Sequence, residues 1–421
     1  MTSNSGAIRQ IKKGEYILRQ GEAGELAYIV ESGQIEMIIE LSDGTKKHVI
    51  EGAGCLFGEL ALLANTKRAA SAVALEDTTL ICITRADFTR RIDSADPILK
   101  LITQNLVRYC QTLLDRNSDE YLNLFEGLEI DSVSPDTKRI EEAPQEGRQP
   151  AEIAHSSELV STMRMEHALS HAIDNNELEL YYQPIINLTT LETSGFEALM
   201  RWNHPADGMI SPNIFIPLAE DTGLIEQLSE WALREATQAL SRFETLSGAP
   251  DNLYISVNFS SHDLSKPEFL TELNKAVQST QLSPGQIKIE ITERLLIMQP
   301  EVAAKTLQDC RDAGFSIAID DFGTGYSSLS YLQDFPIDTL KIDRAFVKKM
   351  VADSTSEELV RTIVHLGKTL GMDIIAEGAE TIEEVQKLIA LNCDMVQGYY
   401  FSPPMEESKV TECFHKWTIS E

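Results

Sequence analysis

Acidic and amide side chains recur at the ends of short apolar segments in the second half of this 421-residue chain. They are Glu197, Asn258, Glu290, Asp320, Asp321 and Glu377. Side chains on a strand alternate between its two faces, so Asn258 points away from its apolar neighbours Ile255 and Val257. If the apolar faces pack on helices, the carboxylates converge on one interior point. Clustered carboxylates repel one another unless hard cations bind between them. The pattern therefore predicts the site of a metal-dependent hydrolase.

Strand and helix patterns alternate from Ser156 to the end of the chain, and these elements must position the acidic residues. Apolar residues recur at helical spacing in five segments, at residues 224–243, 269–278, 300–313, 356–370 and 381–391. Alternation of this length predicts a (β/α) barrel or a doubly wound sheet. In a barrel, catalytic groups lie at the carboxyl ends of the strands, which is where the acidic residues fall.

Residues 8–92 follow a different pattern, in which short β segments are separated by glycines. The turn Glu31-Ser32-Gly33-Gln34 predicts one hairpin and Asp43-Gly44 predicts a second. These features indicate an all-β roll or barrel. An amphipathic helix is predicted from Asp96 to about Leu114, and the proline-containing, weakly apolar stretch after it reads as a linker. We expect a first domain at residues 1–118, a linker at 119–155 and a second domain at 156–421.

The overall charge narrows the possible partners. With 66 acidic and 36 basic residues the net charge is −30, which disfavours binding to a nucleic-acid polymer or an anionic membrane. The six cysteines form no Cys-x-x-Cys pair and read as reduced thiols. The N-terminus has no apolar signal region, and no apolar stretch reaches membrane-spanning length. We expect a cytoplasmic protein.

A second chemical signal lies in the N-terminal half. Phe57-Gly58-Glu59-Leu60-Ala61 is followed by Arg68-Ala69-Ala70. Backbone N–H groups at a tight turn into a short helix bind phosphate. Arg68 would neutralise that phosphate and Glu59 would accept hydrogen bonds from a ribose hydroxyl, so the segment suits a cyclic nucleotide. The alternative is an internal ion pair between Glu59 and Arg68 in a domain that binds no ligand.

The second half resembles bacterial EAL domains in the order and content of its motifs. These are Tyr182-Gln183-Pro184, Glu197-Ala198-Leu199-Met200-Arg201-Trp202, Val257-Asn258, Glu290-Ile291-Thr292-Glu293, Asp320-Asp321-Phe322-Gly323-Thr324-Gly325-Tyr326-Ser327-Ser328-Leu329, Lys341-Ile342-Asp343, Ala376-Glu377-Gly378-Ala379-Glu380 and Gln397-Gly398-Tyr399. The resemblance covers residues 156–421. It implies a modified (β/α)₈ barrel that hydrolyses cyclic di-GMP to linear pGpG with two Mg²⁺ or Mn²⁺ ions.

The resemblance also implies roles for individual residues. The implied metal ligands are Glu197, Asn258, Glu290, Asp320, Asp321, Glu377 and Glu380, with Asp320 bridging the two ions. The implied catalytic residues are Lys341, Glu377, Glu197, Asp320 and Asp321. Lys341 would orient the attacking water or offset negative charge, and Glu377 would be a ligand or a general base. The implied substrate-binding residues are Gln183, Arg201 and Gln397. Glu293 would hold the loop at residues 321–328.

The first half resembles cyclic-nucleotide-binding domains, over residues 8–115. The implied nucleotide-binding residues are Phe57, Gly58, Glu59, Leu60, Ala61, Arg68, Ala69 and Ala70, and Ala69 favours cAMP over cGMP. Together the two resemblances imply a cyclic di-GMP phosphodiesterase that cAMP or cGMP controls allosterically, acting as a homodimer. The alternative is a non-catalytic receptor for both nucleotides that acts through a partner protein.

Overall fold

The computed structural model describes residues 8–40, 44–64, 66–94, 150–298, 300–323 and 335–419. The chain divides into two compact units, one of residues 1–171 with 221–223 and one of residues 172–220 with 224–421. The helix predicted at residues 96–114 and residues 119–149 of the predicted linker lie outside the described ranges. Within those ranges, no helix combines the length and the apolar content that crossing a bilayer requires.

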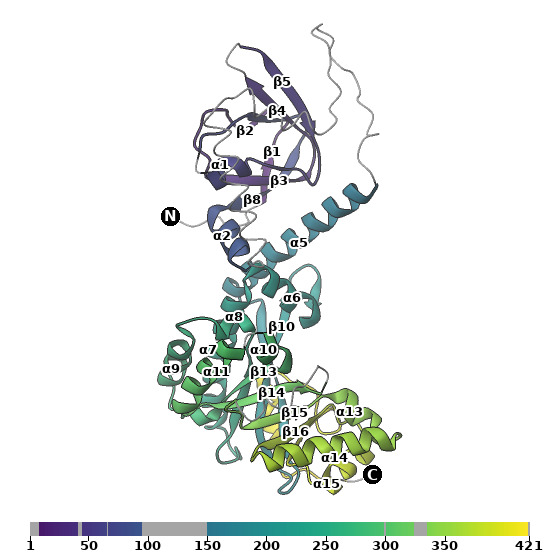
Figure 1. The fold of residues 1–421 in the computed structure, drawn as a ribbon. Coiled ribbons are helices and arrows are strands. Elements are labelled where there is room, and N and C mark those ends of the chain that lie inside the picture. The colour runs from purple at the N-terminus through teal and green to yellow at the C-terminus, as the bar shows by residue number, and fades with distance from the viewer. Residues whose placement is uncertain are drawn as a thin grey trace. The chain divides into compact units, whose positions relative to one another are not determined.

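The N-terminal unit contains a roll of two antiparallel sheets (Figure 1). One sheet has the order β1-β8-β3-β6 and the other β2-β7-β4-β5. The strands are β1 (Ile8–Ile11), β2 (Tyr16–Leu18), β3 (Leu26–Ser32), β4 (Ile35–Glu40), β5 (Lys46–Glu51), β6 (Leu56–Phe57), β7 (Ser71–Ala74) and β8 (Thr78–Thr84). Tyr28, Val30, Ile35 and Leu80 are buried between the sheets. The predicted all-β roll is confirmed.

The turn at Gly33 corrects one prediction. Strands β3 and β4 do not form a hairpin, because β3 pairs with β8 and β6 while β4 pairs with β5 and β7. Gly33 has a φ of 96°, and a Cβ there would lie 2.5 Å from Thr78 Oγ1, so the chain turns tightly and crosses to the other sheet. The second predicted hairpin is confirmed, since β4 and β5 pair in antiparallel register.

Helices α1 (Glu59–Ala64), α2 (Arg85–Ser94) and α5 (Pro150–Asp174) complete the described part of this half. Helix α5 includes residues 150–155, which fall at the end of the predicted linker. Proline suits the first position of a helix, where no intrahelical N–H bond is lost. Val160 and Met163 of α5 pack on a buried cluster of the roll that includes Ile29, Leu62 and Ile83.

The C-terminal unit is a closed barrel (Figure 1). Its described strands are β9 (Leu178–Asn187), β10 (Thr193–His204), β12 (Tyr254–Asn258), β13 (Ile287–Thr292), β14 (Ser316–Phe322), β15 (Thr339–Ile342), β16 (Asp373–Glu377) and β17 (Met395–Gln397). The short strand β11 (Gly208–Ile210) pairs antiparallel with the end of β10. Strand β9 runs antiparallel to both β10 and β17, whereas the other barrel strands pair in parallel. This reversed strand is what makes the barrel a modified one, as predicted.

The helices of this unit follow the predicted segments. They are α6 (Pro212–Thr222), α7 (Ile225–Phe243), α8 (Ser261–Leu264), α9 (Phe269–Gln278), α10 (Glu293–Met298), α11 (Pro300–Asp312), α13 (Arg344–Lys349), α14 (Ser354–Thr369) and α15 (Ile382–Ala390), with 3₁₀ turns η1 (Pro284–Gln286) and η2 (Glu407–Cys413). Side-chain caps set their starts: Asp353 accepts from Ser356 N, and Thr381 forms a capping box with Glu384. The five predicted helices are confirmed to within two residues at each end.

Candidate functional site

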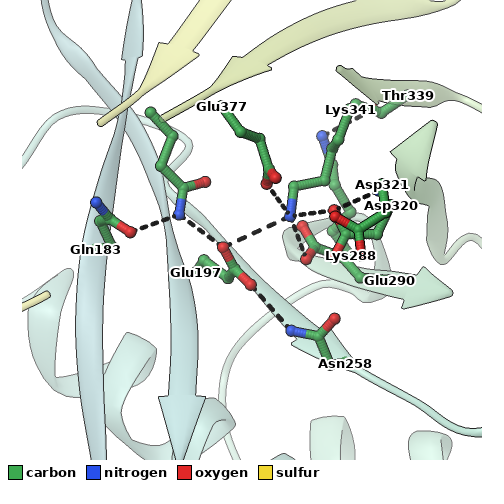
Figure 2. A network of polar contacts seen from close by, with 11 residues as sticks. Gln183, Glu197, Asn258, Lys288, Glu290, Asp320, Asp321, Thr339, Lys341 and Glu377 are labelled. Atoms are coloured by element: carbon green, nitrogen blue, oxygen red, sulfur yellow. Dashed lines mark hydrogen bonds and ion pairs between the residues drawn. The ribbon is translucent and has the colours of Figure 1, made fainter. Parts of the chain in front are cut away.

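The barrel strands bring the predicted acidic residues together at one end. Register pairs Asn258 with Glu290, Thr292 with Asp320 and Glu377 with Gln397. Because neighbouring strands are in register, the inward side chains from β10, β12, β13, β14 and β16 reach similar depths. Figure 2 shows their side chains gathered around the amino group of Lys341, which comes from β15.

Lys341 is the central cation of this cluster. Its Nζ lies 2.7 Å from Glu377 Oε1, 2.8 Å from Glu290 Oε2, 3.0 Å from Asp320 Oδ1 and 3.5 Å from Glu197 Oε2 (Figure 2). The lysine side chain is fully buried. Burial by itself would lower the pKa of Lys341, but the four carboxylates hold that pKa well above its usual value. One ammonium group therefore neutralises part of a larger negative charge.

Glu290 retains capacity for a further cation. Burial, together with Glu197 and Asp320, raises the pKa of Glu290 to about 8 against the opposing effect of Lys341. Its Oε1 is buried and has no hydrogen-bond partner among the described residues. A buried polar atom without a partner is costly, and a bound divalent cation would satisfy it.

Two overlapping sets of carboxylates have the spacing of metal ligands. Glu197, Glu290 and Asp320 form one set, and Asp320, Asp321 and Glu377 form the other. The ligand atoms of each set lie within 4.8 Å of one another, and Asp320 belongs to both. Burial, reinforced by the charges of Asp320 and Asp343, raises the pKa of Asp321 to about 6. Carboxylates at this spacing could hold divalent metal ions, and Asp320 belongs to both sets.

A chain of amides fixes the orientation of Glu197. Asn258 Nδ2 donates to Glu197 Oε1 at 2.9 Å (Figure 2). Gln397 Nε2 donates to Glu197 Oε2 at 2.6 Å. Gln397 Nε2 also lies 2.9 Å from Gln183 Oε1, and Gln183 donates to the carbonyl of Ser402. Gln397 Oε1 is buried with no partner among the described residues, so it is an acceptor available to a ligand.

Arg201 is the third predicted substrate residue. Its guanidinium lies 5.3 Å from the Tyr181 ring centroid and donates to the carbonyl of Met200. Burial lowers the pKa of Arg201, and Tyr399 and Tyr181 oppose that effect. The described structure contains no ion pair between Arg201 and a carboxylate, so its charge remains available to an anion.

Two predicted residues lie at the margin of the cluster. Glu293 Oε2 accepts from Gly323 N at 3.1 Å, which is the contact expected of a residue that supports the loop after β14; residues 324–334 of that loop lie outside the described ranges. Glu380 is not brought into the cluster. The chain turns at Gly378, which has a φ of 70°, and the Glu380 carboxylate pairs with Lys348 at 2.6 Å. The structure gives no support to Glu380 as a metal ligand.

Sequence reasoning missed the residues beneath the cluster. Lys288 precedes Glu290 by two positions on β13 and is buried within the barrel, with only 5% of the residue exposed. Its Nζ donates to Thr339 Oγ1 at 2.9 Å (Figure 2). It also lies 4.1 Å from the Tyr254 ring centroid. The available signal was the alternation itself, because Lys288 must share the inward face with Glu290.

In the N-terminal unit, the predicted nucleotide-binding residues also lie together. Phe57 stacks on Tyr28 with ring centroids 5.4 Å apart. Gly58 has a φ of 77°, and a Cβ there would lie 2.7 Å from Arg68 Nη1, so only glycine fits between the strand and the arginine. Leu60 and Ala61 follow Glu59 in the first turns of α1, and Ala69 and Ala70 lead from Arg68 into β7.

Arg68 is buried and held by backbone carbonyls. Its Nη1 donates to Gly58 O at 2.8 Å and its Nη2 to Leu26 O at 2.5 Å. Among the described residues of this domain, no ion pair joins Arg68 to Glu59. The internal ion pair of the alternative interpretation is therefore absent. Burial raises the pKa of Glu59 and lowers the pKa of Arg68, so it disfavours the charged form of both groups. A ligand that binds the charged forms would stabilise them.

Family profiles match both halves of the chain. The EAL domain matches residues 166–404, and the cyclic nucleotide-binding domain matches residues 8–95. Cyclic di-GMP phosphodiesterase NbdA from Pseudomonas aeruginosa is 37% identical over 250 residues, which are 59% of this chain and 32% of that protein. Oxygen sensor protein DosP from Escherichia coli is 35% identical over 246 residues, which are 58% of this chain and 30% of that protein. The chain spans about a third of the length of the curated relatives it matches.

Solved structures resemble the chain over nearly its whole length. The cAMP-bound form of EAL enzyme Bd1971 is 31% identical with a TM-score of 0.58, and the match covers 97% of this chain and 100% of that chain. A form of Bd1971 with cAMP and cyclic-di-GMP bound gives a TM-score of 0.59. The PaMucR phosphodiesterase in complex with c-di-GMP is 36% identical with a TM-score of 0.56, over 59% of this chain and 99% of that chain. The chain therefore belongs to the EAL domain family and carries an N-terminal cyclic nucleotide-binding domain.

Proposed function

We propose that the barrel hydrolyses cyclic di-GMP to linear pGpG with two Mg²⁺ or Mn²⁺ ions. The observation that carries this proposal is the pair of carboxylate sets that share Asp320, next to the fully buried Lys341. In the reaction, water adds across one phosphodiester P–O bond, the cyclic dinucleotide opens, and the departing ribose oxygen takes a proton. NbdA and PaMucR are named as phosphodiesterases, which supports this substrate class.

Each side chain has a role in this proposal that follows from its contacts. When bound, the ions would lower the pKa of a water molecule and stabilise charge on the reacting phosphate. Lys341 places a fixed positive charge beside the reacting oxygens, where it offsets the charge that develops in the transition state. Glu377 is partly buried, which raises its pKa, so it is suited to accept the proton of the attacking water. Arg201 binds a phosphate, and Gln183 and Gln397 orient the substrate.

A competing function is that of a receptor that binds cyclic di-GMP without cleaving it. The complete carboxylate sets and Lys341 favour the enzyme. Incubation of the purified chain with cyclic di-GMP and Mg²⁺ or Mn²⁺, with and without a chelator, separates the two. Metal-dependent release of pGpG is the expected result. Tight binding of cyclic di-GMP with no pGpG under any metal condition would replace the enzyme by the receptor.

We further propose that cAMP or cGMP binds the N-terminal roll at Gly58, Glu59 and Arg68 and regulates the barrel. The cyclic nucleotide phosphate would accept hydrogen bonds from the turn into α1 and from Arg68, while Glu59 would bind the ribose hydroxyl. Bd1971 structures with cAMP and with cGMP support a ligand of this class. A ligand alters activity only when it binds two states of the protein unequally.

Helix α5 offers the physical route for this regulation. Leu62 lies in α1, next to the proposed phosphate site, and belongs to the same buried cluster as Met163 of α5. Arg164 of α5 pairs with Glu31, whose side chain is nearly buried. The helix then continues to Asp174, and the first barrel strand begins at Leu178. A ligand that moves α1 therefore changes the packing surface of the helix that leads into the barrel.

Turnover of cyclic di-GMP measured with and without cAMP, and with cGMP for comparison, tests the regulation. A change in turnover at nucleotide concentrations that saturate the roll is the expected result. Tight cAMP binding with unchanged turnover would overturn it. We also propose a homodimer, which sedimentation at enzyme assay concentrations would detect.

A further inference from the structure

Beneath the carboxylate cluster lies a second buried cation, Lys288. It projects from β13 on the same side as Glu290, one interior layer lower, which is about 7 Å along the strand. The described part of the chain contains no carboxylate within ion-pair distance of its amino group. Its contacts are the Thr339 hydroxyl at 2.9 Å (Figure 2) and the face of Tyr254 at 4.1 Å. The Tyr254 hydroxyl in turn lies 3.6 Å from Met395 Sδ, so this tyrosine supplies no negative charge.

A lysine buried among neutral groups is unfavourable unless charges farther away compensate for it. The cluster above carries an excess of negative charge, because four carboxylates surround the single ammonium of Lys341: Glu197, Glu290, Asp320 and Glu377. The charges of Asp373 and Asp338 also act on Lys288. Coulomb attraction falls only with the inverse of distance and is weakly screened inside a protein. Lys288 is thus placed to act on the cluster without touching it.

We propose that Lys288 limits the affinity of the site for divalent cations. Its buried amino group lies beneath the carboxylates, and its charge repels an incoming cation, so the ions stay exchangeable. The inference rests on the metal site of the proposed function and adds a residue that contacts neither metal nor substrate.

Calorimetric titration of the metal-stripped full chain with Mn²⁺ at neutral pH tests this proposal. Lys288→Met removes the charge and the hydrogen bond to Thr339. Lys288→Gln removes the charge and keeps an amide donor. Removing one positive charge at this distance is expected to tighten Mn²⁺ binding about tenfold in both variants. Lys266→Met is the matched control, because Lys266 pairs with Glu226 outside the cluster. The Mn²⁺ affinity of this variant should equal that of the wild type.

The outcomes distinguish an electrostatic role of Lys288 from a purely structural role. Tightening in both Lys288 variants but not in Lys266→Met supports the proposal. Unchanged or weaker Mn²⁺ binding in a folded Lys288→Gln chain overturns it, as does loss of the fold in both variants, which would make Lys288 purely structural. If the wild type itself binds no Mn²⁺ or Mg²⁺, the proposed metal-dependent function fails first, and this inference fails with it.

Discussion

Lys341 and Glu290 form an ion pair in which both side chains are fully buried, with Nζ 2.8 Å from Oε2. Removing one member of such a pair leaves an uncompensated charge in a low dielectric, which costs about 3–5 kcal/mol. Lys341→Met should therefore lower the thermal stability of the metal-free protein, and should lower kcat about a hundredfold or more because the transition-state charge loses a fixed partner. Thermal melts with and without Mn²⁺ and steady-state kinetics measure the two effects. A variant with normal kcat would remove Lys341 from the mechanism.

Glu197 and Glu380 are both acidic residues of the predicted ligand list, but the structure places them differently. Glu197→Ala should reduce turnover by more than about a hundredfold, because a metal ligand contributes several kcal/mol of stabilisation to the transition state. Glu380→Ala loses only an exposed pair with Lys348 and should retain activity. Turnover of the two variants at saturating Mn²⁺ makes the comparison. Equal losses in both would show that Glu380 also belongs to the metal site.

Arg68 is expected to be the main contact with the phosphate of the N-terminal ligand. Arg68→Ala should weaken cAMP binding about tenfold to a hundredfold, the usual worth of a hydrogen bond to a charged group. Arg19→Ala is a suitable control, since Arg19 lies over the Tyr16 ring. Fluorescence titration with a labelled cAMP analogue measures the affinity, and circular dichroism establishes that the roll remains folded. Unchanged affinity in Arg68→Ala would place the ligand elsewhere.

Met163 tests the proposed route through α5. Truncation to alanine removes its packing on the cluster that contains Leu62, so the ratio of turnover with cAMP to turnover without it should fall towards one. Binding of cAMP should persist, because Met163 is not a ligand contact. Thr162→Ala, an exposed neighbour on the same helix, should leave the ratio unchanged. Full regulation in Met163→Ala would mean that the signal travels by another path.

Lys288 gives the fold a defined pH dependence. Burial lowers its pKa to about 8, below the usual value of 10.5, so the native state binds fewer protons than the unfolded state between these two values. The free energy of unfolding should then rise with pH across this window, by as much as about 3 kcal/mol relative to Lys288→Met. The wild type and Lys288→Met are unfolded with denaturant in the presence of chelator, at pH 7.5 and at higher pH. The difference between their free energies of unfolding is compared across these pH values. If the free energies of unfolding of the two proteins changed equally with pH, burial would not lower the pKa of Lys288 as stated.

The sequence predicted those features that depend on local pattern. The inward alternation of Asn258, Glu290 and Asp320 follows from strand periodicity, and the outer helices follow from apolar spacing. The turn at Gly33 was wrongly predicted to form a hairpin, because the same turn residues also suit a connection between two sheets. Only the long-range pairing of β3 with β8 distinguishes the two arrangements. Glu380 was predicted as a metal ligand from its motif, which does not encode the ion pair that its carboxylate forms with Lys348 of α13. Lys288 was overlooked because a lysine on a strand reads as solvent-exposed unless the strand is known to line a closed barrel.

Asp320 contributes to both carboxylate sets, and this has a consequence for any binding curve recorded on the protein. If the two sets hold two ions, as proposed, occupation of the first would change the charge offered to the second. Their affinities would then be properties of the pair, in the same way that two acids sharing one proton have joint ionisation constants. A titration of this centre should deviate from a simple hyperbola, and substitution of Asp320 should alter both phases at once.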